Sequence, residues 1–134
     1  PISATVKGKR VVLIDDSIVR GTTAARIVKL LREAGATEVH MRISAPPFLN
    51  PCYYGTDIDS RDSLIAVHHS QEEVCQIIGA DSLGYLSVEN VQKLAEHCGG
   101  FCTACFSGCY PTQVPENTRK LRFERKLSEK EPKA

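Results

Sequence analysis

The stretch VVLIDDSIVRGTT, residues 11–23, decides the fold of this chain. It begins with a continuous β-branched and aliphatic run, which is typical of a strand buried on both faces in a parallel sheet. Two aspartates end that run, and a loop through Gly21 follows. Because Thr22 or Thr23 can cap a helix, the stretch predicts a strand, a short loop and then a helix.

The predicted helix continues to Gly35, which supplies its stop. Its apolar positions recur at helical spacing, at Ile27, Leu30, Leu31 and Ala34. A second strand is predicted after it, because residues 39, 41 and 43 are apolar and alternate with polar ones, and a Pro-Pro pair closes it. His40 alternates outward in that strand and is interpreted as a surface residue.

Two more helices and one more strand are predicted in the second half of the chain. Ser70 and Glu73 have the spacing of a capping box ahead of a helix that ends at Gly79. Residues 82–86 predict a short strand, and Ser87 can cap a helix over 88–95. His68 and His69, which end an apolar stretch, are expected to be polar residues at a strand end.

This order of elements predicts an α/β layer with a parallel sheet and right-handed crossovers. The sequence offers only about three strands, where open sheets commonly have about four to six. The sheet is therefore expected to be incomplete. Periodicity stops beyond His97, where a cysteine-rich turn begins, and residues 119–133 form a charged tail with seven basic and three acidic residues. We interpret that tail as a solvated helix or as disorder.

The composition restricts the possible partners. The chain has 134 residues, 42% of them hydrophobic and 25% charged, and a net charge of +1, which predicts binding to neither nucleic acid nor a membrane surface. It contains no apolar run of the about 20 residues that span a bilayer, and residues 1–10 lack the apolar core of a secretory signal. We therefore expect a cytoplasmic protein. In that compartment the six cysteines indicate metal ligation or reduced thiols rather than disulfides.

The loop that follows the first strand has the features of a phosphate site. Gly21 allows backbone amides to approach a phosphate closely, the hydroxyls of Thr22 and Thr23 can donate to its oxygens, and the helix N-terminus favours its charge. Asp15 and Asp16 would repel a phosphate, unless they accept hydrogen bonds from sugar hydroxyls or bind magnesium. The pattern therefore indicates a phosphorylated sugar with Mg²⁺.

The acidic pair allows two other interpretations. Response-regulator receivers also begin with an acidic pair after a strand, but they need a further aspartate at a strand end, and the second strand here ends in SAPP, residues 44–47. The pair could instead cap a structural loop. A purely structural turn, however, has no need of the RGTT that follows at residues 20–23.

The stretch resembles the phosphoribosyl pyrophosphate signature of type I phosphoribosyltransferases, in the form DDSIVRGTT found in glutamine phosphoribosylpyrophosphate amidotransferases. The resemblance covers most of the chain up to about residue 112. It continues through LREAGA at 31–36, PCYYG at 51–55, IGAD at 78–81 and CTACF at 102–106. It implies a partial type I phosphoribosyltransferase fold with a cysteine-rich C-terminal segment.

The resemblance also implies roles for single residues. Asp15 and Asp16 would contact the ribose and Mg²⁺, and no residue would act as a nucleophile. The 5'-phosphate would be cradled by Ser17, Val19, Arg20, Gly21, Thr22 and Thr23. The implied reaction joins glutamine-derived ammonia to phosphoribosyl pyrophosphate to give 5-phosphoribosylamine, the first step of de novo purine synthesis. Members of the family are homo-oligomers, namely tetramers.

The cysteines allow three interpretations. In the cluster-bearing form of the family, the positions of Cys52, Cys102 and Cys105 bind a 4Fe-4S cluster, and the fourth ligand lies upstream of this segment. Cys98, Cys102, Cys105 and Cys109 have spacings that could instead form a local zinc site. The third possibility is that the thiols are reduced and structural. Cys75 is expected to be a small residue at the edge of the core.

By the same resemblance, residues 1–97 would be the C-terminal part of a phosphoribosyltransferase domain, 98–114 the cluster-ligand segment and 115–134 a charged tail. The family's N-terminal glutaminase domain, pyrophosphate loop and flexible loop have no counterpart here. The chain is therefore expected to be inactive by itself. Two alternatives stay open, a non-catalytic regulatory module that senses phosphoribosyl pyrophosphate and a zinc-binding interaction domain.

Overall fold

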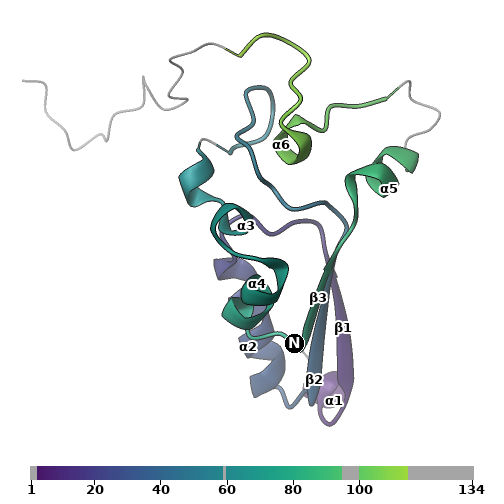
Figure 1. Cartoon of the computed structure of the whole chain (residues 1–134). Helices are drawn as coiled ribbons and strands as arrows, with labels where there is room; N and C mark the ends of the chain where they lie inside the picture. Colours follow the sequence, from purple (N-terminus) through teal and green to yellow (C-terminus); the bar gives the residue numbers. More distant parts are fainter. Residues whose placement is uncertain (1–2, 59, 95–99, 115–134) are drawn as a thin grey trace, which may run out of the picture.

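The computed structural model describes residues 3–58, 60–94 and 100–114. Three parallel strands form one sheet in the order β1-β2-β3, which confirms the predicted α/β layer (Figure 1). The strands are β1 (Arg10–Asp15), β2 (Glu38–Ile43) and β3 (Ser82–Tyr85). The helices are α1 (Ser3–Val6), α2 (Thr22–Glu33), α3 (Ile65–His68), α4 (Gln71–Ile78), α5 (Val88–Lys93) and α6 (Ala104–Ser107), and Arg61–Ser63 is a 3-10 turn. No helix in these ranges is long and apolar enough to cross a membrane.

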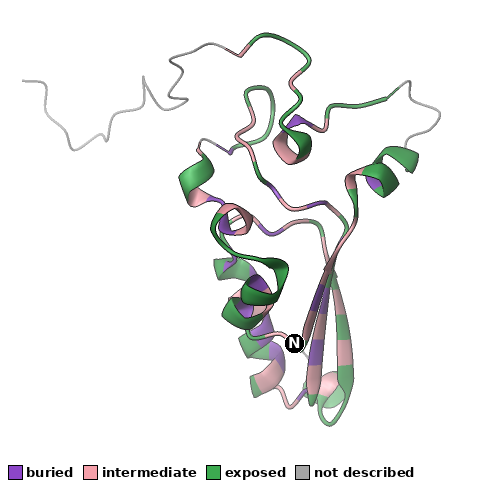
Figure 2. Ribbon diagram, viewed as in Figure 1, coloured by how far each residue is buried: buried purple, intermediate pink, exposed green. Residues whose placement is uncertain are grey.

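The main core lies between the sheet and the helices α2 and α4. The alternation predicted for β2 is confirmed, because Val39 and Met41 are fully buried and Ile43 is 3% exposed. Val28 from α2 and Val74 from α4 are also buried and belong to the same cluster (Figure 2). Aliphatic side chains of this size each contribute about 1.5–3 kcal/mol when fully buried, so this layer holds the three strands in place.

The first strand is not buried on both faces, and that expectation was wrong. Val12 is 63% exposed and Ile14 is 74% exposed, whereas the intervening residues are half-buried. The reason is visible in Figure 1, where α2 and α4 cover only one face of the sheet. The opposite face of β1 carries apolar residues that no described element covers.

Helix α2 begins one residue earlier than its threonines suggested. Its N-cap is Gly21, with a left-handed φ of 79°, and no side chain caps it. The predicted threonine cap is therefore wrong, since both hydroxyls lie beyond the cap. The buried stripe of α2 also differs from the predicted one, because it runs through Ala24, Val28 and Leu31, whereas Leu30 is 40% exposed.

The remaining helix caps agree with the sequence. Ser70 and Glu73 form the predicted capping box of α4, and Gly79 ends that helix in a left-handed conformation. Ser87 caps α5 through the amide of Asn90. The predicted strand end at His68 and His69 was wrong: His68 ends the short helix α3, and the chain turns directly into α4. The apolar run before them is so short and irregular that its periodicity does not distinguish a helix from a strand.

A second, smaller apolar cluster lies beyond the sheet. Phe48, Ile58 and Leu64 are its buried members, and the partly buried Cys105 and Phe106 of α6 pack against it. The rings of Phe48 and Phe106 are 4.9 Å apart between centroids. The amides of Leu49 and Asn50 both donate to the Cys105 carbonyl, so the segment with α6 is bound to the loop after β2. The charged tail predicted at 119–133 lies outside the described residues.

Candidate functional site

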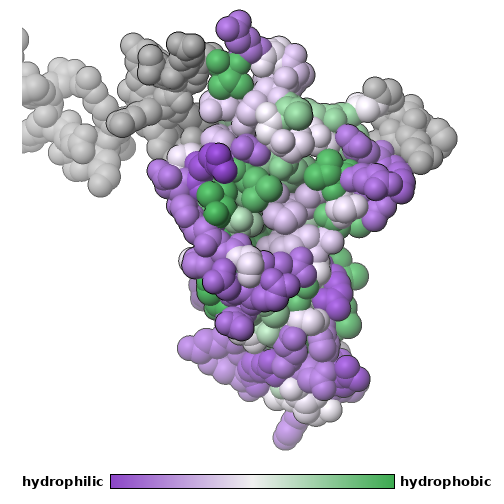
Figure 3. Space-filling model, viewed as in Figure 1, coloured by the Kyte–Doolittle hydropathy of each residue, from purple (hydrophilic) through white to green (hydrophobic). Residues whose placement is uncertain are grey.

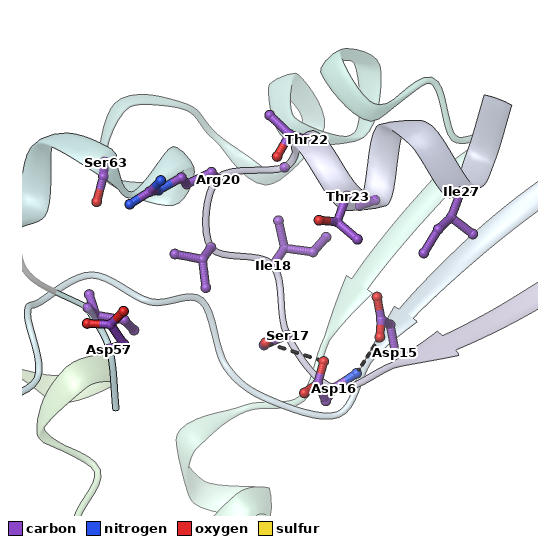
Figure 4. A pocket seen from close by; sticks show the side chains of 14 residues that line it. Asp15, Asp16, Ser17, Ile18, Arg20, Thr22, Thr23, Ile27, Asp57 and Ser63 are labelled. Carbon is purple, nitrogen blue, oxygen red and sulfur yellow. Dashed lines mark hydrogen bonds between the residues drawn. The ribbon is translucent and has the colours of Figure 1, made fainter. Parts of the chain in front are cut away.

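A cavity of about 590 Å³ opens at the carboxyl end of β1. All the residues predicted to hold a phosphorylated sugar line it, and Figure 4 shows them around one open space. They are Asp15, Asp16, Ser17, Val19, Arg20, Gly21, Thr22 and Thr23. Ligands of open parallel sheets bind at this edge, so the position of the cavity agrees with the topology.

The backbone of the loop is available to a ligand. Within the described ranges, the amides of residues 19–23 donate no hydrogen bond to the protein. The side chains of Thr22 and Thr23 are exposed and likewise make no hydrogen bond to described residues. A loop that gathers unpaired N–H and O–H donors at the positive end of a twelve-residue helix is suited to bind an anion.

Neighbouring residues of the loop anchor it in two different cores. Ile18 is 3% exposed in the main core, whereas Val19 packs against the second cluster. The Val19 carbonyl also accepts the amide of Ile65 at 2.9 Å. The loop is thus fixed on both sides before a ligand arrives, which lowers the conformational entropy lost on binding.

Gly21 is required for two reasons. Its φ of 79° is a conformation that L side chains rarely adopt, and a Cβ there would lie 2.7 Å from Cδ1 of Ile65. The same left-handed residue caps α2, and its carbonyl accepts the amide of Ala25 at 2.9 Å. The glycine therefore turns the loop into the helix while leaving the amides beside it open.

Asp15 and Asp16 line the cavity where β1 ends. The amide of Asp16 donates to Oδ1 of Asp15 at 3.0 Å, and the hydroxyl of Ser17 lies 3.4 Å from Oδ1 of Asp16 (Figure 4). Asp15 is half-buried and Asp16 exposed, so both carboxylates retain oxygens that can accept further hydrogen bonds. Oxygen donors of this kind suit sugar hydroxyls or a hard cation.

Six lining residues were not predicted, and three of them, Ile18, Ala24 and Ile27, belong to the loop and to α2. The other three are Asp57, Ile58 and Ser63, and Figure 4 shows Asp57 and Ser63 across the cavity from the aspartate pair. They come from the long connection between β2 and α3, where the amide of Cys52 donates to the Ile58 carbonyl and closes a turn. The sequence of this connection has no periodicity, so only the tertiary fold brings it over the cavity.

Cys52 and Cys105 pack against the same apolar cluster. Burial acts to raise the pKa of the Cys52 thiol, but backbone amides, including that of Thr56 at 3.3 Å from Sγ, outweigh it and lower the pKa overall. The pKa of Cys105 is raised by its burial first and then by the charges of Cys52 and Cys102. Within the described parts, however, no three Cys, His, Asp or Glu side chains are gathered around one metal position.

The other cysteines and the histidine of β2 lie away from the cavity. Cys75 is half-buried against the main core and donates to the Ala80 carbonyl, as expected for a residue at the core boundary. Cys98, one member of the alternative zinc site, lies outside the described residues. His40 faces outward as predicted, between Ser82 and the carboxylate of Glu38.

Known proteins share the sequence that builds this site. The chain is 52% identical over 124 residues to the amidophosphoribosyltransferase of Synechococcus elongatus, and 53% identical over 122 residues to that of Bacillus subtilis. These alignments cover 92% and 87% of the chain. The chain is homologous to a segment of amidophosphoribosyltransferase. No protein-family model matches it.

The fold agrees with that of amidophosphoribosyltransferase. A solved structure of the B. subtilis glutamine phosphoribosylpyrophosphate amidotransferase, complexed with ADP and GMP, superposes with a TM-score of 0.77 at 54% identity over 87% of the chain. A structure described as the allosteric regulatory enzyme of purine biosynthesis gives a TM-score of 0.80 at 52% identity. The chain spans only about a quarter of these amidophosphoribosyltransferases, 25–27% of their length.

Proposed function

We propose that this chain forms the ribose and 5'-phosphate subsite of an amidophosphoribosyltransferase, the enzyme that makes 5-phosphoribosylamine from phosphoribosyl pyrophosphate and glutamine-derived ammonia. One observation carries the proposal. The unpaired amides of residues 19–23 and the carboxylates of Asp15 and Asp16 line a single cavity beside a helix N-terminus. The names of the relatives support the assignment to de novo purine synthesis.

Different residues of the cavity bind the phosphate and the ribose of the sugar phosphate. The amides of residues 19–23, the hydroxyls of Thr22 and Thr23 and the charge of Arg20 hold the 5'-phosphate, while Asp15 and Asp16 accept the ribose hydroxyls. In the reaction, ammonia forms the new C–N bond at the anomeric carbon as the bond to pyrophosphate breaks. Positive charge develops on the ring, and the two carboxylates stabilise it.

The same carboxylates fit Mg²⁺, which prefers oxygen ligands and retains several of its waters. We assign Asp15 and Asp16 as the residues that hold it next to the sugar. When bound, Mg²⁺ neutralises the charge of the pyrophosphate that leaves.

We assign Cys52, Cys102 and Cys105 as three ligands of a 4Fe-4S cluster. The donor set fits, because iron-sulfur clusters are held by cysteine thiolates, and the backbone amides around Cys52 favour its thiolate. Cys52 and Cys105 already pack against one apolar cluster, and Cys102 precedes Cys105 in the same C-x-x-C pair. The fourth cysteine would come from the rest of the polypeptide. If Cys98 and Cys109 joined Cys102 and Cys105 instead, the site would bind zinc.

The remaining parts of the enzyme would supply the other functions. We expect the glutaminase domain, the pyrophosphate loop and a homo-oligomeric assembly in the complete protein, and an inactive chain without them. A cytoplasmic location is proposed from the sequence, although relatives from Arabidopsis thaliana carry the description chloroplastic.

The site is tested by Asp15→Asn and Asp16→Asn in the full-length protein, measured as ammonia-dependent formation of phosphoribosylamine. Each change removes charge-assisted hydrogen bonds of about 1.5–3 kcal/mol, so we expect turnover to fall about 10- to 100-fold. Asp62→Asn is the control, because this exposed aspartate lies outside the cavity lining. Unchanged turnover in both variants would reject the site. Tight binding of phosphoribosyl pyrophosphate without turnover in the wild type would favour the regulatory module.

The metal is tested by anaerobic purification followed by iron, sulfide and zinc analysis and by visible absorption of the thiolate-to-iron band. We expect four irons per chain in the full-length protein and loss of the band in Cys52→Ser. Cys75→Ser is the control, since Cys75 packs against the main core, away from the second cluster. Stoichiometric zinc without iron would replace the cluster assignment by the zinc site.

A further inference from the structure

Two stretches of the chain that carry cysteines contain no charged residue. They are residues 44–56, the Cys52 stretch, and residues 100–114, the C-x-x-C stretch, and neither has an aspartate, glutamate, lysine, arginine or histidine. Figure 3 shows hydrophobic and weakly polar residues around and below α6, whereas the surface over α4 is mostly hydrophilic. Contacts other than ion pairs therefore hold the two stretches together.

Tyr110 contacts both sequence neighbours of Cys52. Its hydroxyl donates to the Pro51 carbonyl at 2.7 Å, and its ring meets that of Tyr53 edge to face, with 5.1 Å between the centroids. Tyr110 and Pro51 are both half-buried, so water competes little for this hydrogen bond. The position of Cys52 thus depends on one side chain of the C-x-x-C stretch.

The contacts between the two stretches do not use the cysteine sulfurs. Besides the tyrosine contacts, two backbone amides of the Cys52 stretch donate to the Cys105 carbonyl, which fixes the backbone of the second cysteine. Sγ of Cys52 accepts the amide of Thr56 at 3.3 Å, a hydrogen bond that a metal-bound thiolate can keep. Fixing the backbone around both thiols in advance lowers the entropy lost when a metal binds.

We propose that Tyr110 is a positioning residue for the 4Fe-4S cluster, which holds Cys52 against the C-x-x-C stretch so that the thiolates are gathered before iron binds. Its ring also limits the access of water to Cys52. The inference rests on the proposed cluster, and Tyr110 does not itself bind iron. Groups outside the ligand shell orient the ligands, and solvent exposure tunes the potential of such clusters, so loss of the Tyr110 contacts should alter both iron retention and potential.

The test measures iron loss from the anaerobically purified full-length protein after addition of a ferrous chelator, followed as decay of the thiolate-to-iron band. Tyr110→Phe removes only the hydrogen bond to Pro51, and we expect iron loss to be about 3- to 10-fold faster. Tyr110→Leu also removes the ring contact, and we expect at least about 30-fold faster loss. Tyr54→Phe is the matched control, because the Tyr54 hydroxyl joins the same two stretches through Thr112 at 2.8 Å, but in an exposed position. We expect a change of less than about twofold there.

The midpoint potential of the cluster separates positioning from a general loss of stability. Unfolding of a weakened protein removes clusters but leaves the potential of the remaining ones unchanged. Water near Cys52, in contrast, stabilises the more negative reduced cluster and raises the potential. We expect a higher potential in Tyr110→Leu and the wild-type value in Tyr54→Phe.

Three results would overturn the inference while leaving the cluster in place. They are wild-type iron loss in both Tyr110 variants, equally fast loss in Tyr54→Phe and Tyr110→Phe, and faster loss in Tyr110→Leu without a change in potential. A wild-type protein that binds no iron would overturn the proposed cluster and this inference together.

Discussion

Gly21 joins the proposed phosphate loop, residues 17–21, to α2 in a left-handed conformation and against the side chain of Ile65. Gly21→Ala should therefore lower the free energy of unfolding by about 1 kcal/mol for the backbone strain and by about 1–3 kcal/mol more for the contact. Gly8→Ala is a matched control, because Gly8 has a similar φ of 73° and no atom lies within 4 Å of the position that a Cβ would take there. Urea denaturation of both variants measures the difference. Equal losses would mean that Ile65 moves away freely.

Tyr85 has a buried hydroxyl without a hydrogen-bond partner in the described structure, and burial raises its pKa. Leaving such a group unsatisfied costs about 1–3 kcal/mol, so Tyr85→Phe should raise the free energy of unfolding by about 1 kcal/mol. Tyr110→Phe is the control. It should lower the free energy of unfolding, since the Tyr110 hydroxyl donates to the Pro51 carbonyl at 2.7 Å. Thermal unfolding in parallel checks both. A destabilised Tyr85→Phe would show that the hydroxyl has a partner in solution.

At the scale of elements, Asp81 connects α4 and β3 to the neighbouring parts of the layer. Its carboxylate accepts the amide of Val39 at 2.6 Å and the guanidinium of Arg32 at 2.5 Å, and these bonds, the amide first, lower its pKa from the ordinary value of 3.8. A carboxyl group with a lowered pKa in the folded state stabilises the protein above its unfolded pKa. That contribution is lost as the pH falls below 3.8 through the folded value.

Asp81→Asn should therefore flatten the dependence of stability on pH in this acidic range, in addition to lowering stability at neutral pH. The measurement is the urea midpoint at about pH 7 and about pH 3 for the wild type and the variant. Glu89→Gln serves as control, because its ion pair with Lys93 is exposed on α5. If the urea midpoint fell by the same amount between these two pH values in Asp81→Asn and in the wild type, Asp81 would make no such contribution.

The elements themselves were largely predictable where local chemistry decides them. The strand predicted at residues 11–14, the capping box of α4 and its stop at Gly79 are set by neighbours within a few residues, and the structure has each of them, with the strand extended to Arg10–Asp15. The burial of β1 was not predictable, because the composition of a strand is the same whether or not a helix covers its second face. The position of Asp57, and the helical turn at His68, depend on contacts from distant segments.

At the scale of the whole molecule, the proposed phosphate loop lies between two apolar clusters. Ile18 belongs to the main core and Val19 to the cluster around Phe48, so the cysteine segment supports the loop through α6. The sheet and α2 position the carboxylates and the helix N-terminus from one side. The loop thus contacts a cluster that a segment about 80 residues away in sequence helps to build, and we expect the site to depend on that segment.

Phe106→Ala tests that dependence. The ring is half-buried against Phe48, so its removal should cost the second cluster about 2 kcal/mol, less than the about 3–5 kcal/mol of a fully buried phenylalanine. Phe101→Ala is the control, since that ring is 41% exposed in the same segment. We expect faster hydrogen exchange in residues 48–58 and 100–114 of Phe106→Ala, unchanged exchange in β2, and several-fold weaker binding of ribose 5-phosphate. Binding that stays unchanged while those segments open would show that the main core alone fixes the proposed phosphate loop.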